Sequence, residues 1–408
     1  MKYCVKCVMP DTKPDLKFNK DGVCSACEYY EKRRDINWQE RRKELMKVLE
    51  KYKSKDGHNW DCIVPVSGGK DSTYQVVKML QLGMSPLCVT ATTCHLSDVG
   101  RKNIENLKNL GVDYVEFSTN PIVRRKLNRI ALSRVGDISW PEHVSIFTIP
   151  VQTAVNYRIP LIIWGENPQN EYGGPAAAGS NNVLDRKWLM SFGGLLGMNL
   201  SDFEGKEGIE GKDLIAYTYP SDQQLKDGGV TGLFLGHYFP WDGLSNALFS
   251  TAFGFTSYSG AIEGSMANYE NVDNYQTGIH DYFKYLKYGF GRVTDFACLH
   301  LRRGRLSRED ALQIVQRLDG KFPWSYLGKP LQEILSPLSL SIDQFIQICD
   351  KFTNKKIFKT DTQGNLVKDA DGNLIKLYHP IELSQRTAAA YYPQSTVVRS
   401  YEDISSAI

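Results

Sequence analysis

An apolar run that ends in a glycine-rich loop is the feature that most constrains the fold of this chain. The run covers residues 61–66, and the loop Ser-Gly-Gly-Lys-Asp-Ser follows at 67–72, before a helical pattern over 72–82. A strand, a tight turn and a helix in this order bring backbone N–H groups and the positive end of a helix dipole to one point. A plain turn is the alternative. The loop lacks the longer spacing of the Walker pattern, so it predicts a phosphate site for a different nucleotide chemistry.

Alternating strand and helix patterns continue beyond this loop. Because parallel strands need helical crossovers, the alternation predicts an α/β fold with a doubly wound parallel sheet and helices on both faces. Ligands bind such sheets at the carboxyl ends of the strands. The predicted strands are 61–66, 86–93, 112–117 and 160–164, and the predicted helices between them are 72–82, 98–110, 121–134 and 144–157.

Two paired cysteine motifs lie near the N-terminus. Cys4 and Cys7 form the first C-x-x-C pair, and Cys24 and Cys27 form the second, at the spacing of a four-thiolate zinc ribbon. Four protein ligands leave no position for water or substrate, so a zinc ion here is expected to be structural. An iron–sulfur cluster, a redox dithiol and two unrelated coincidences are the alternatives. The ribbon is predicted over 1–30, and amphipathic helical patterns predict a connector over 31–60.

The charge balance and the hydropathy call for neither a large nucleic-acid surface nor a membrane span. With 49 basic and 46 acidic residues in 408, the formal charge is +3, which demands no large surface for nucleic acid. We find no apolar stretch near eighteen residues and no signal peptide, so a soluble, cytoplasmic protein with two or three domains is expected, without membrane contact.

Several further segments carry candidate residues. Glu166 follows a predicted strand, so its carboxylate is expected at the nucleotide edge of the sheet; a surface acid is the alternative. Small residues over 168–212 suit a lid-like insertion or a plain linker within an α/β domain of 61–230. The remainder, 231–408, is predicted to be a mostly helical region for substrate or partner. Cys94 and His95 are weak candidates, and two Gly-Asn turns near 364 and 372 predict hairpins rather than a calcium loop.

The loop at 67–72 resembles the pyrophosphatase loop, or PP-loop, of enzymes of the adenine nucleotide alpha hydrolase-like class, which cleave ATP between its α- and β-phosphates. Four further stretches strengthen the likeness, and with the loop they resemble the N-acetyl sugar amidotransferases of bacterial surface polysaccharide (lipopolysaccharide) and flagellin glycan pathways, the WbpG and PseA type, which include pseudaminic acid synthesis. The four stretches are 4–27, 163–174, 234–242 and 280–295.

The resemblance implies an enzyme that adenylates the acetamido carbonyl of an N-acetyl sugar and replaces its oxygen with ammonia, giving an acetamidino sugar. ATP, Mg²⁺ and Zn²⁺ are the implied cofactors. Ser67, Gly68, Gly69, Asp71, Ser72 and Gly165 would bind the nucleotide, Lys70 would neutralise phosphate charge, Asp71 would contact magnesium with help from Glu166, and Asn167, Glu171, Trp241, Asp242, His280, Asp281, Lys284 and Arg292 would contact the substrate.

The ammonia donor is expected to be a separate protein. No cysteine of this chain lies in a glutaminase pattern, so the resemblance implies a separate glutaminase partner, together with a barrel-shaped channel subunit. The sugar substrate is free or nucleotide-linked.

Two other functions fit the same motifs. Thiolases that modify tRNA join a similar loop to cysteine knuckles, and Cys94 near a predicted strand end would serve them. A zinc-ribbon adaptor that senses ATP without turnover is the non-enzymatic alternative.

Overall fold

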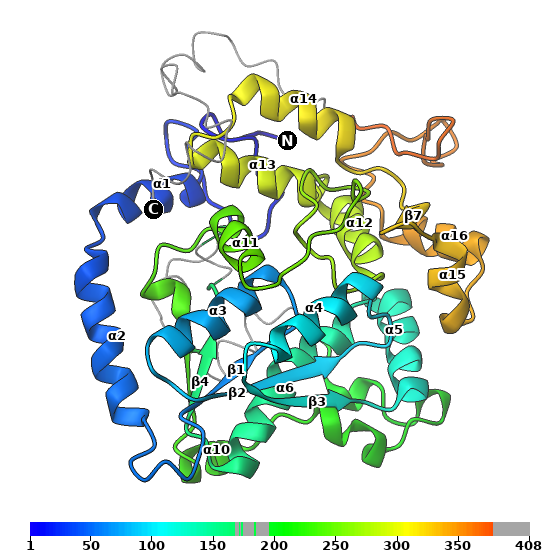
Figure 1. Cartoon of the computed structure of the whole chain (residues 1–408). Coiled ribbons are helices and arrows are strands. Elements are labelled where there is room, and N and C mark those ends of the chain that lie inside the picture. The colour runs from blue at the N-terminus through cyan, green and yellow to red at the C-terminus, as the bar shows by residue number, and fades with distance from the viewer. Residues whose placement is uncertain (168–170, 172, 174–182, 185–195, 378–408) are drawn as a thin grey trace.

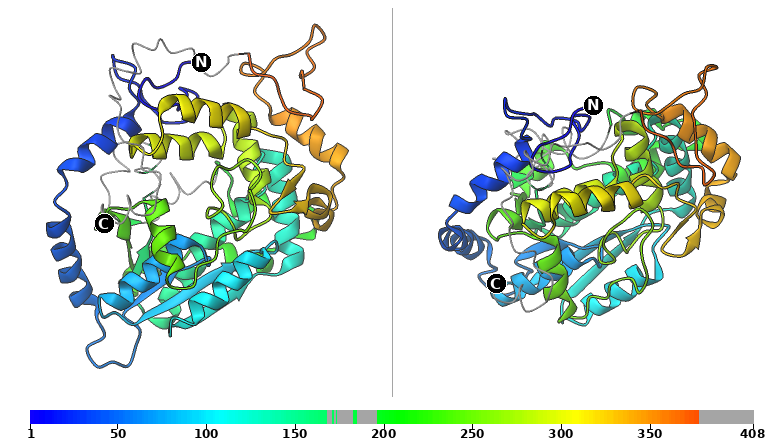
Figure 2. Two further views of the ribbon diagram at one scale, coloured as in Figure 1. Left: turned by 45° about the horizontal axis from the view of Figure 1, so that its top comes forward. Right: turned by 90° about the horizontal axis from the view of Figure 1, so that it is seen from above.

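A six-stranded sheet lies at the centre of the protein. The computed structural model describes residues 1–167, 171, 173, 183–184 and 196–377, and helices cover both faces of its sheet (Figures 1 and 2). The strand order is β3-β2-β1-β4-β6-β5, in which the first five strands are parallel and β5 is antiparallel to β6. The strands are β1 (Cys62–Pro65), β2 (Pro86–Thr92), β3 (Asp113–Ser118), β4 (Leu161–Trp164), β5 (Val183–Leu184) and β6 (Thr231–Phe234).

The predicted parallel α/β sheet is therefore confirmed, and its strand order positions the site. From β1 the chain runs outward to β3 and then returns to β4 on the other side of β1. The crossover direction changes between β1 and β4, and in such sheets ligands bind in the crevice at that switch point.

The two faces of the sheet are covered by different helices. Val64 of β1 lies in one hydrophobic cluster with Val76 of α3, whereas its neighbour Ile63 lies in another cluster with Ile149 of α6. This alternation follows from the two-residue period of a strand, and it explains why β1 is apolar throughout.

The helices around the sheet agree with the predicted ranges except at one end. Helix α6 begins at Trp140, earlier than the predicted 144, because Pro141 fits the first turn of a helix. The helices are α3 (Lys70–Gln81), α4 (Asp98–Lys108), α5 (Pro121–Val135), α6 (Trp140–Tyr157) and α10 (Asp222–Asp227).

The N-terminal cysteine module contacts the C-terminal half of the chain. Helices α1 (Ser25–Lys32) and α2 (Trp38–Tyr52) lead from the cysteines to the sheet, where Leu45 and Leu49 are buried. The cysteines share a hydrophobic cluster with Val293 and Leu301 of α13 and with Val315 of α14. Figure 2 shows the N-terminal module (blue) and the helices α13 and α14 (yellow) on the same side of the molecule. The predicted strand within the module is reduced to isolated bridges, Tyr3 with Pro10 and Phe18 with Cys24.

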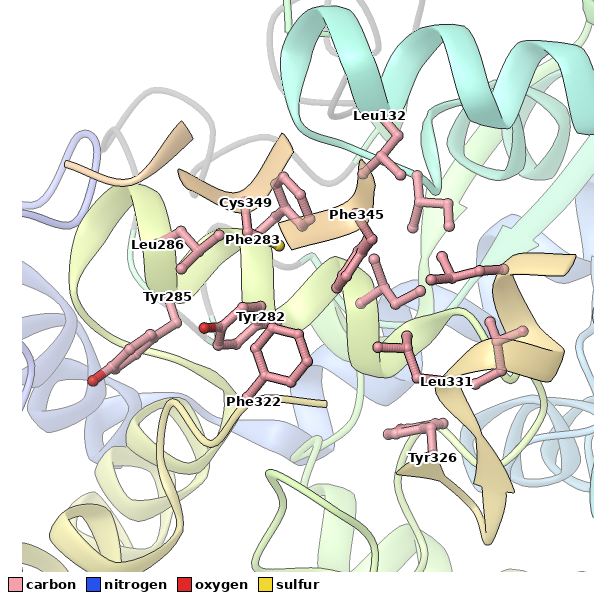
Figure 3. Close-up of a cluster of buried hydrophobic side chains, with 14 of the residues drawn as sticks. Leu132, Tyr282, Phe283, Tyr285, Leu286, Phe322, Tyr326, Leu331, Phe345 and Cys349 are labelled. Atoms are coloured by element: carbon pink, nitrogen blue, oxygen red, sulfur yellow. The ribbon is translucent and has the colours of Figure 1, made fainter. Parts of the chain in front are cut away.

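In the described part of the C-terminal region, helices joined by long irregular segments enclose an aromatic core of their own. Phe283, Phe322 and Phe345 stack edge to face in it (Figure 3). Its elements are α11 (Gly243–Thr251), α12 (Thr277–Tyr288), α13 (Arg292–Arg302), α14 (Arg308–Leu318), α15 (Leu331–Leu335), α16 (Ile342–Phe352) and a small hairpin of β7 (Ser325–Tyr326) and β8 (Lys329–Pro330).

Three smaller predictions have different outcomes in the structure. The two Gly-Asn turns close short bridges, Thr360 with Leu366 and Lys368 with Leu374, which confirms the hairpins. Most of the lid-like insertion 168–212 lies outside the described residues, and its described end holds short 3-10 turns at Leu200–Asp202 and Lys206–Gly208. Among the helices described, none has the length and apolar character needed to span a membrane.

Candidate functional site

The loop Ser67–Ser72 joins β1 to α3 and is held in a shape that only glycine permits. Gly68 has φ +83°, and a Cβ there would lie 3.0 Å from the backbone nitrogen of Ile104. The Ser72 hydroxyl accepts a hydrogen bond from the Ser67 N–H at 3.0 Å. Gly69 occupies the N-cap of α3 without a capping side chain, so the first-turn N–H groups are available to an anion.

A cavity of about 460 Å³ lies beside this loop, within the size range of small-molecule sites. The carboxyl ends of β1, β2 and β4 form one wall, α6 forms a second, and the segment 271–280 forms a third. Its lining includes the predicted residues Ser67, Asp71, Ser72, Gly165, Glu166, His280 and Arg292.

Four residues with carboxyl groups line this cavity, Asp71, Glu142, Glu166 and Asp273, and Glu142 is paired with Arg124 at 3.0 Å. Burial raises the pKa of Glu166 from its ordinary 4.5 to about 8, and the charge of Asp71 adds to the effect. Burial also raises the pKa of Asp273. Carboxylate oxygens crowded in this way are the donors that Mg²⁺ prefers, and a cation would relieve their repulsion, so the residues fit a magnesium ion.

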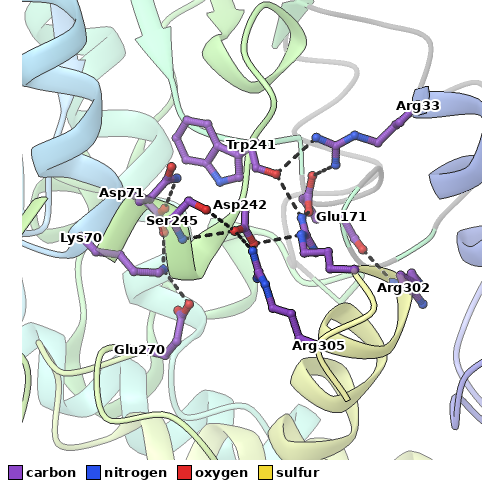
Figure 4. Close-up of polar contacts among 12 residues, drawn as sticks. Arg33, Lys70, Asp71, Glu171, Trp241, Asp242, Ser245, Glu270, Arg302 and Arg305 are labelled. Carbon is purple, nitrogen blue, oxygen red and sulfur yellow. Dashed lines mark hydrogen bonds and ion pairs between the residues drawn. The ribbon is translucent and has the colours of Figure 1, made fainter. Parts of the chain in front are cut away.

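Asp71 is held in place from the opposite side of the loop. The amide of Asn246 on α11 donates to its Oδ1 at 2.8 Å, and the ammonium of Lys70 lies 2.5 Å from its Oδ2. Lys70 is buried and also pairs with Glu270 at 2.7 Å (Figure 4). Burial disfavours the charged ammonium, but these two carboxylates hold the pKa of Lys70 well above its ordinary value.

Lys70 differs in position from Ser67, Asp71 and Ser72, which line the large cavity. Its side chain does not line the large cavity but a small space of about 30 Å³ behind the loop. The physical reason is that a buried ammonium needs carboxylate partners, and Glu270 supplies one from the C-terminal region. The phosphate contact of Lys70 stays a prediction.

Several predicted substrate residues belong to a buried ionic network. Glu171 pairs with Arg33 at 2.6 Å and with Arg303 at 2.9 Å, and Asp242 pairs with Arg303 at 2.9 Å (Figure 4). Although burial opposes ionisation, hydrogen bonds from Arg305 and the charge of Arg303 hold the pKa of Asp242 below its usual value.

The network joins distant parts of the chain. The backbone oxygen of Trp241 accepts from Arg33 at 3.2 Å and from Arg303 at 3.0 Å. It therefore connects the N-terminal helices to α11 and α13. The carboxylates of Glu171 and Asp242 and the backbone oxygen of Trp241 already have partners within the protein. Asn167 lines a separate cavity of about 320 Å³ that also reaches Glu166.

The four predicted residues of the 280–292 block have different surroundings. His280 and Arg292 line the large cavity. Asp281 does not line it and pairs with Arg292 at 2.8 Å, while Lys284 pairs with Asp295. The spacing predicted that these residues lie on adjoining helix faces. In the structure Asp281 and Lys284 pair with Arg292 and Asp295 of α13, and their side chains do not line the cavity.

The four N-terminal cysteines form a compact buried cluster. Their sulfur atoms lie within 4.8 Å of one another, with Cys7 and Cys24 at 3.7 Å and Cys4 and Cys27 at 3.9 Å. A tetrahedral zinc ion with Zn–S bonds of about 2.3 Å would place its sulfurs about 3.8 Å apart. Backbone N–H groups of Cys7 and Cys24 donate to the Cys4 sulfur at 3.4 and 3.3 Å, so the donor set fits zinc.

Sequence reasoning missed the residues that reach the site from far along the chain. Asn246 contacts Asp71, Glu270 contacts Lys70, and Asp273 lines the same cavity as Glu166. Glu270 and Asp273 lie in a largely polar stretch and Asn246 follows another polar residue, Ser245, between apolar ones, so no local signal distinguishes them from surface residues.

The fold and the site define a protein with a parallel α/β sheet and a phosphate-type loop at its switch point. Residues 255–370 match the family model described as LPS biosynthesis protein WbpG-like, C-terminal domain. This match supports the predicted family over the C-terminal region.

Comparison with other known proteins adds little to this assignment. No curated protein matches the chain. Among solved structures, NMN synthetase from Francisella tularensis is similar at 13% identity and a TM-score of 0.26, over 48% of this chain and 93% of that one.

Proposed function

We propose that the protein is an ATP-dependent amidotransferase that converts the acetamido group of an N-acetyl sugar into an acetamidino group, with AMP and pyrophosphate as products. The observation that carries the proposal is the loop Ser67–Ser72, which opens α3 beside a cavity that also holds Asp71, Glu166 and Asp273. The family match over 255–370, described by its role in LPS biosynthesis, supports a sugar as the substrate.

The reaction has two steps in which atoms are exchanged. The carbonyl oxygen of the acetamido group attacks the α-phosphorus of ATP, and pyrophosphate leaves. Ammonia then attacks the activated carbon, and AMP leaves with the former carbonyl oxygen. Activation is needed because an amide carbonyl is a poor electrophile and its oxygen is a poor leaving group.

The residues of the loop have separate roles in this scheme. The N–H groups at the start of α3 and the hydroxyls of Ser67 and Ser72 hold the departing pyrophosphate. Asp71 and Glu166 would hold Mg²⁺, which would offset charge on the phosphates. Glu166 must lose its proton for this, and the approach of a cation favours that loss.

The source of ammonia and the cellular compartment are also part of this proposal. A separate glutaminase, with a barrel-shaped channel subunit, supplies ammonia in the cytoplasm. The cavity of about 320 Å³ that reaches Glu166 from the side of α1 and α2 offers a second access to the site.

The tRNA thiolase alternative has less support. Cys94 does not line the large cavity, and burial raises the pKa of its thiol, which reduces the thiolate available for sulfur transfer. Only a measurement of turnover distinguishes the adaptor alternative from the proposal, because an adaptor would bind ATP without converting it.

The decisive experiment incubates the protein with ATP, Mg²⁺, an ammonium salt and a panel of N-acetyl sugars labelled with heavy oxygen in the acetamido carbonyl. Mass spectrometry should show a product in which NH replaces oxygen, and the heavy oxygen should appear in AMP. Asp71→Asn should reduce turnover by roughly 10²-fold or more. The matched control is Asp227→Asn, at the exposed end of α10. Formation of ADP and phosphate, or formation of AMP that lacks the heavy oxygen, contradicts the mechanism.

A further inference from the structure

A group of two histidines and an aspartate lies in the wall of the large cavity, apart from the loop. Asp137 is in the turn between α5 and α6, His143 is on α6 and His280 is on α12. The Nδ1 of His280 lies 2.8 Å from one oxygen of Asp137, and the Nδ1 of His143 lies 3.5 Å from the other. Both imidazoles line the cavity.

The carboxylate of Asp137 is a buried charge that needs a cation. Its side chain is only 5% exposed. Glu142 is paired with Arg124 at 3.0 Å and Arg292 with Asp281 at 2.8 Å. The nearby ammonium of Lys287 donates to backbone carbonyl oxygens. Within the part of the chain that the structure describes, the two imidazoles are the only side chains that hydrogen-bond or ion-pair with Asp137. A buried carboxylate in this position is expected to hold either a protonated histidine or a metal ion.

The geometry of the three groups matches a metal site. Their ligand atoms all lie within 4.8 Å of one another. A tetrahedral zinc ion with bonds of about 2.0–2.1 Å would separate its ligand atoms by about 3.3 Å, between the two distances observed here. Two imidazoles and one carboxylate form a mixed donor set that suits zinc, iron, cobalt or manganese better than magnesium.

The backbone around Asp137 is held firmly, as a metal site requires. Gly136 ends α5 in the left-handed conformation, and a Cβ there would lie 2.8 Å from Phe352. Lys287 donates to the carbonyl oxygens of Val135 and Gly136 at 2.6 and 3.0 Å. The Ser139 N–H donates to Asp137 at 2.9 Å. The carboxylate is therefore fixed before any ion arrives.

We propose that Asp137, His143 and His280 bind a divalent transition metal at the end of the cavity formed by α6 and α12. Three protein ligands leave a coordination position open toward the cavity, as in catalytic rather than structural zinc sites. An oxygen of the molecule in the cavity, from a carboxylate, a phosphate or a hydroxyl, can occupy that position. The inference depends on these three residues and stands whether or not the proposed amidotransferase activity is correct.

Metal content of the full chain tests the site directly. After saturation with Zn²⁺ and removal of free metal, elemental analysis should give two equivalents per chain, one at the cysteines and one here. The double variant His143→Ala and His280→Ala should retain one equivalent, and both side chains are partly exposed, at 28% and 26%, so folding should tolerate the change. His58→Ala, on an exposed loop, is the matched control and should retain two.

Titration of the metal-free wild-type protein with Co²⁺ gives a second measurement that does not depend on variants. One equivalent should produce intense thiolate charge-transfer bands, and another should add only weak visible bands typical of nitrogen and oxygen ligands. A single zinc equivalent in the wild type, or two in the folded double variant, overturns the proposal. A second cobalt equivalent with thiolate bands also overturns it.

Discussion

Replacing Glu166 with glutamine should change how the stability of the protein depends on pH. Glutamine has nearly the shape of a protonated glutamate and cannot ionise. Burial and the charge of Asp71 raise the pKa of Glu166 to about 8, whereas its ordinary value is 4.5. Between these values the folded protein keeps a proton on Glu166 that the unfolded chain has lost.

The sign of the effect follows from this difference in bound protons. Because the folded state binds more protons, the free energy of unfolding falls as pH rises from 4.5 to about 8, by up to about 1.4 kcal/mol per pH unit. The full interval would give about 5 kcal/mol, and since the side chain keeps some contact with solvent we expect roughly 2–3 kcal/mol. Wild type and Glu166→Gln should therefore be equally stable near pH 5, and the variant should be more stable near pH 8.5.

Urea unfolding of both proteins across this pH range measures the difference, and subtraction removes the contributions of other titrating groups. In wild type, saturating Mg²⁺ and ATP should reduce the slope of the free energy of unfolding against pH, because a cation at Glu166 favours the ionised form of the carboxyl group. The glutamine variant should show no such change in slope. Parallel stability curves for the two proteins from pH 5 to pH 8.5 would show that Glu166 does not titrate in this interval, and the electrostatic account of the site would then be wrong.

Three further substitutions test other parts of the structure. Cys24→Ser, or a strong chelator, should release the zinc of the cysteine cluster and loosen its contact with α13 and α14, seen as a lower melting temperature and faster proteolysis of the N-terminal module; unchanged zinc content contradicts this. Arg124→Met should cost about 3–5 kcal/mol in the free energy of unfolding, because it leaves the buried carboxylate of Glu142 without its partner, and a cost below about 1 kcal/mol by urea unfolding refutes it. Gly68→Ala should destabilise the fold by about 1–3 kcal/mol through backbone strain, and calorimetry should show weaker ATP binding; unchanged affinity contradicts the role of the loop.

Local patterns predicted the sheet and its helices because each depends on neighbouring residues. Alternation of apolar and helical segments identified β1 to β4, and the glycines of 67–72 identified the loop between β1 and α3. Helix ends were less predictable, as at α6, where Pro141 moves the start forward.

Contacts between distant segments could not be predicted in the same way. Nothing near Lys70 in the sequence indicates Glu270, and nothing near Asp137 indicates His280. Lys284 illustrates this limit. Its helical spacing from His280 suggested a shared site, but its ammonium group forms an ion pair with Asp295 on the next helix. Such pairs depend on how the C-terminal helices pack on the sheet, which has no local signature.

The region that matches the family model of WbpG-like LPS biosynthesis proteins forms part of the cavity wall. Asp273, His280 and Arg292 all lie within 255–370 and all line the cavity, whereas the loop and Glu166 come from the α/β sheet. The sheet thus presents the groups suited to a phosphate and a cation, which any nucleotide shares. The C-terminal region presents the imidazole of His280 and the guanidinium of Arg292, and the choice of the second substrate is therefore expected to depend on these side chains rather than on the loop.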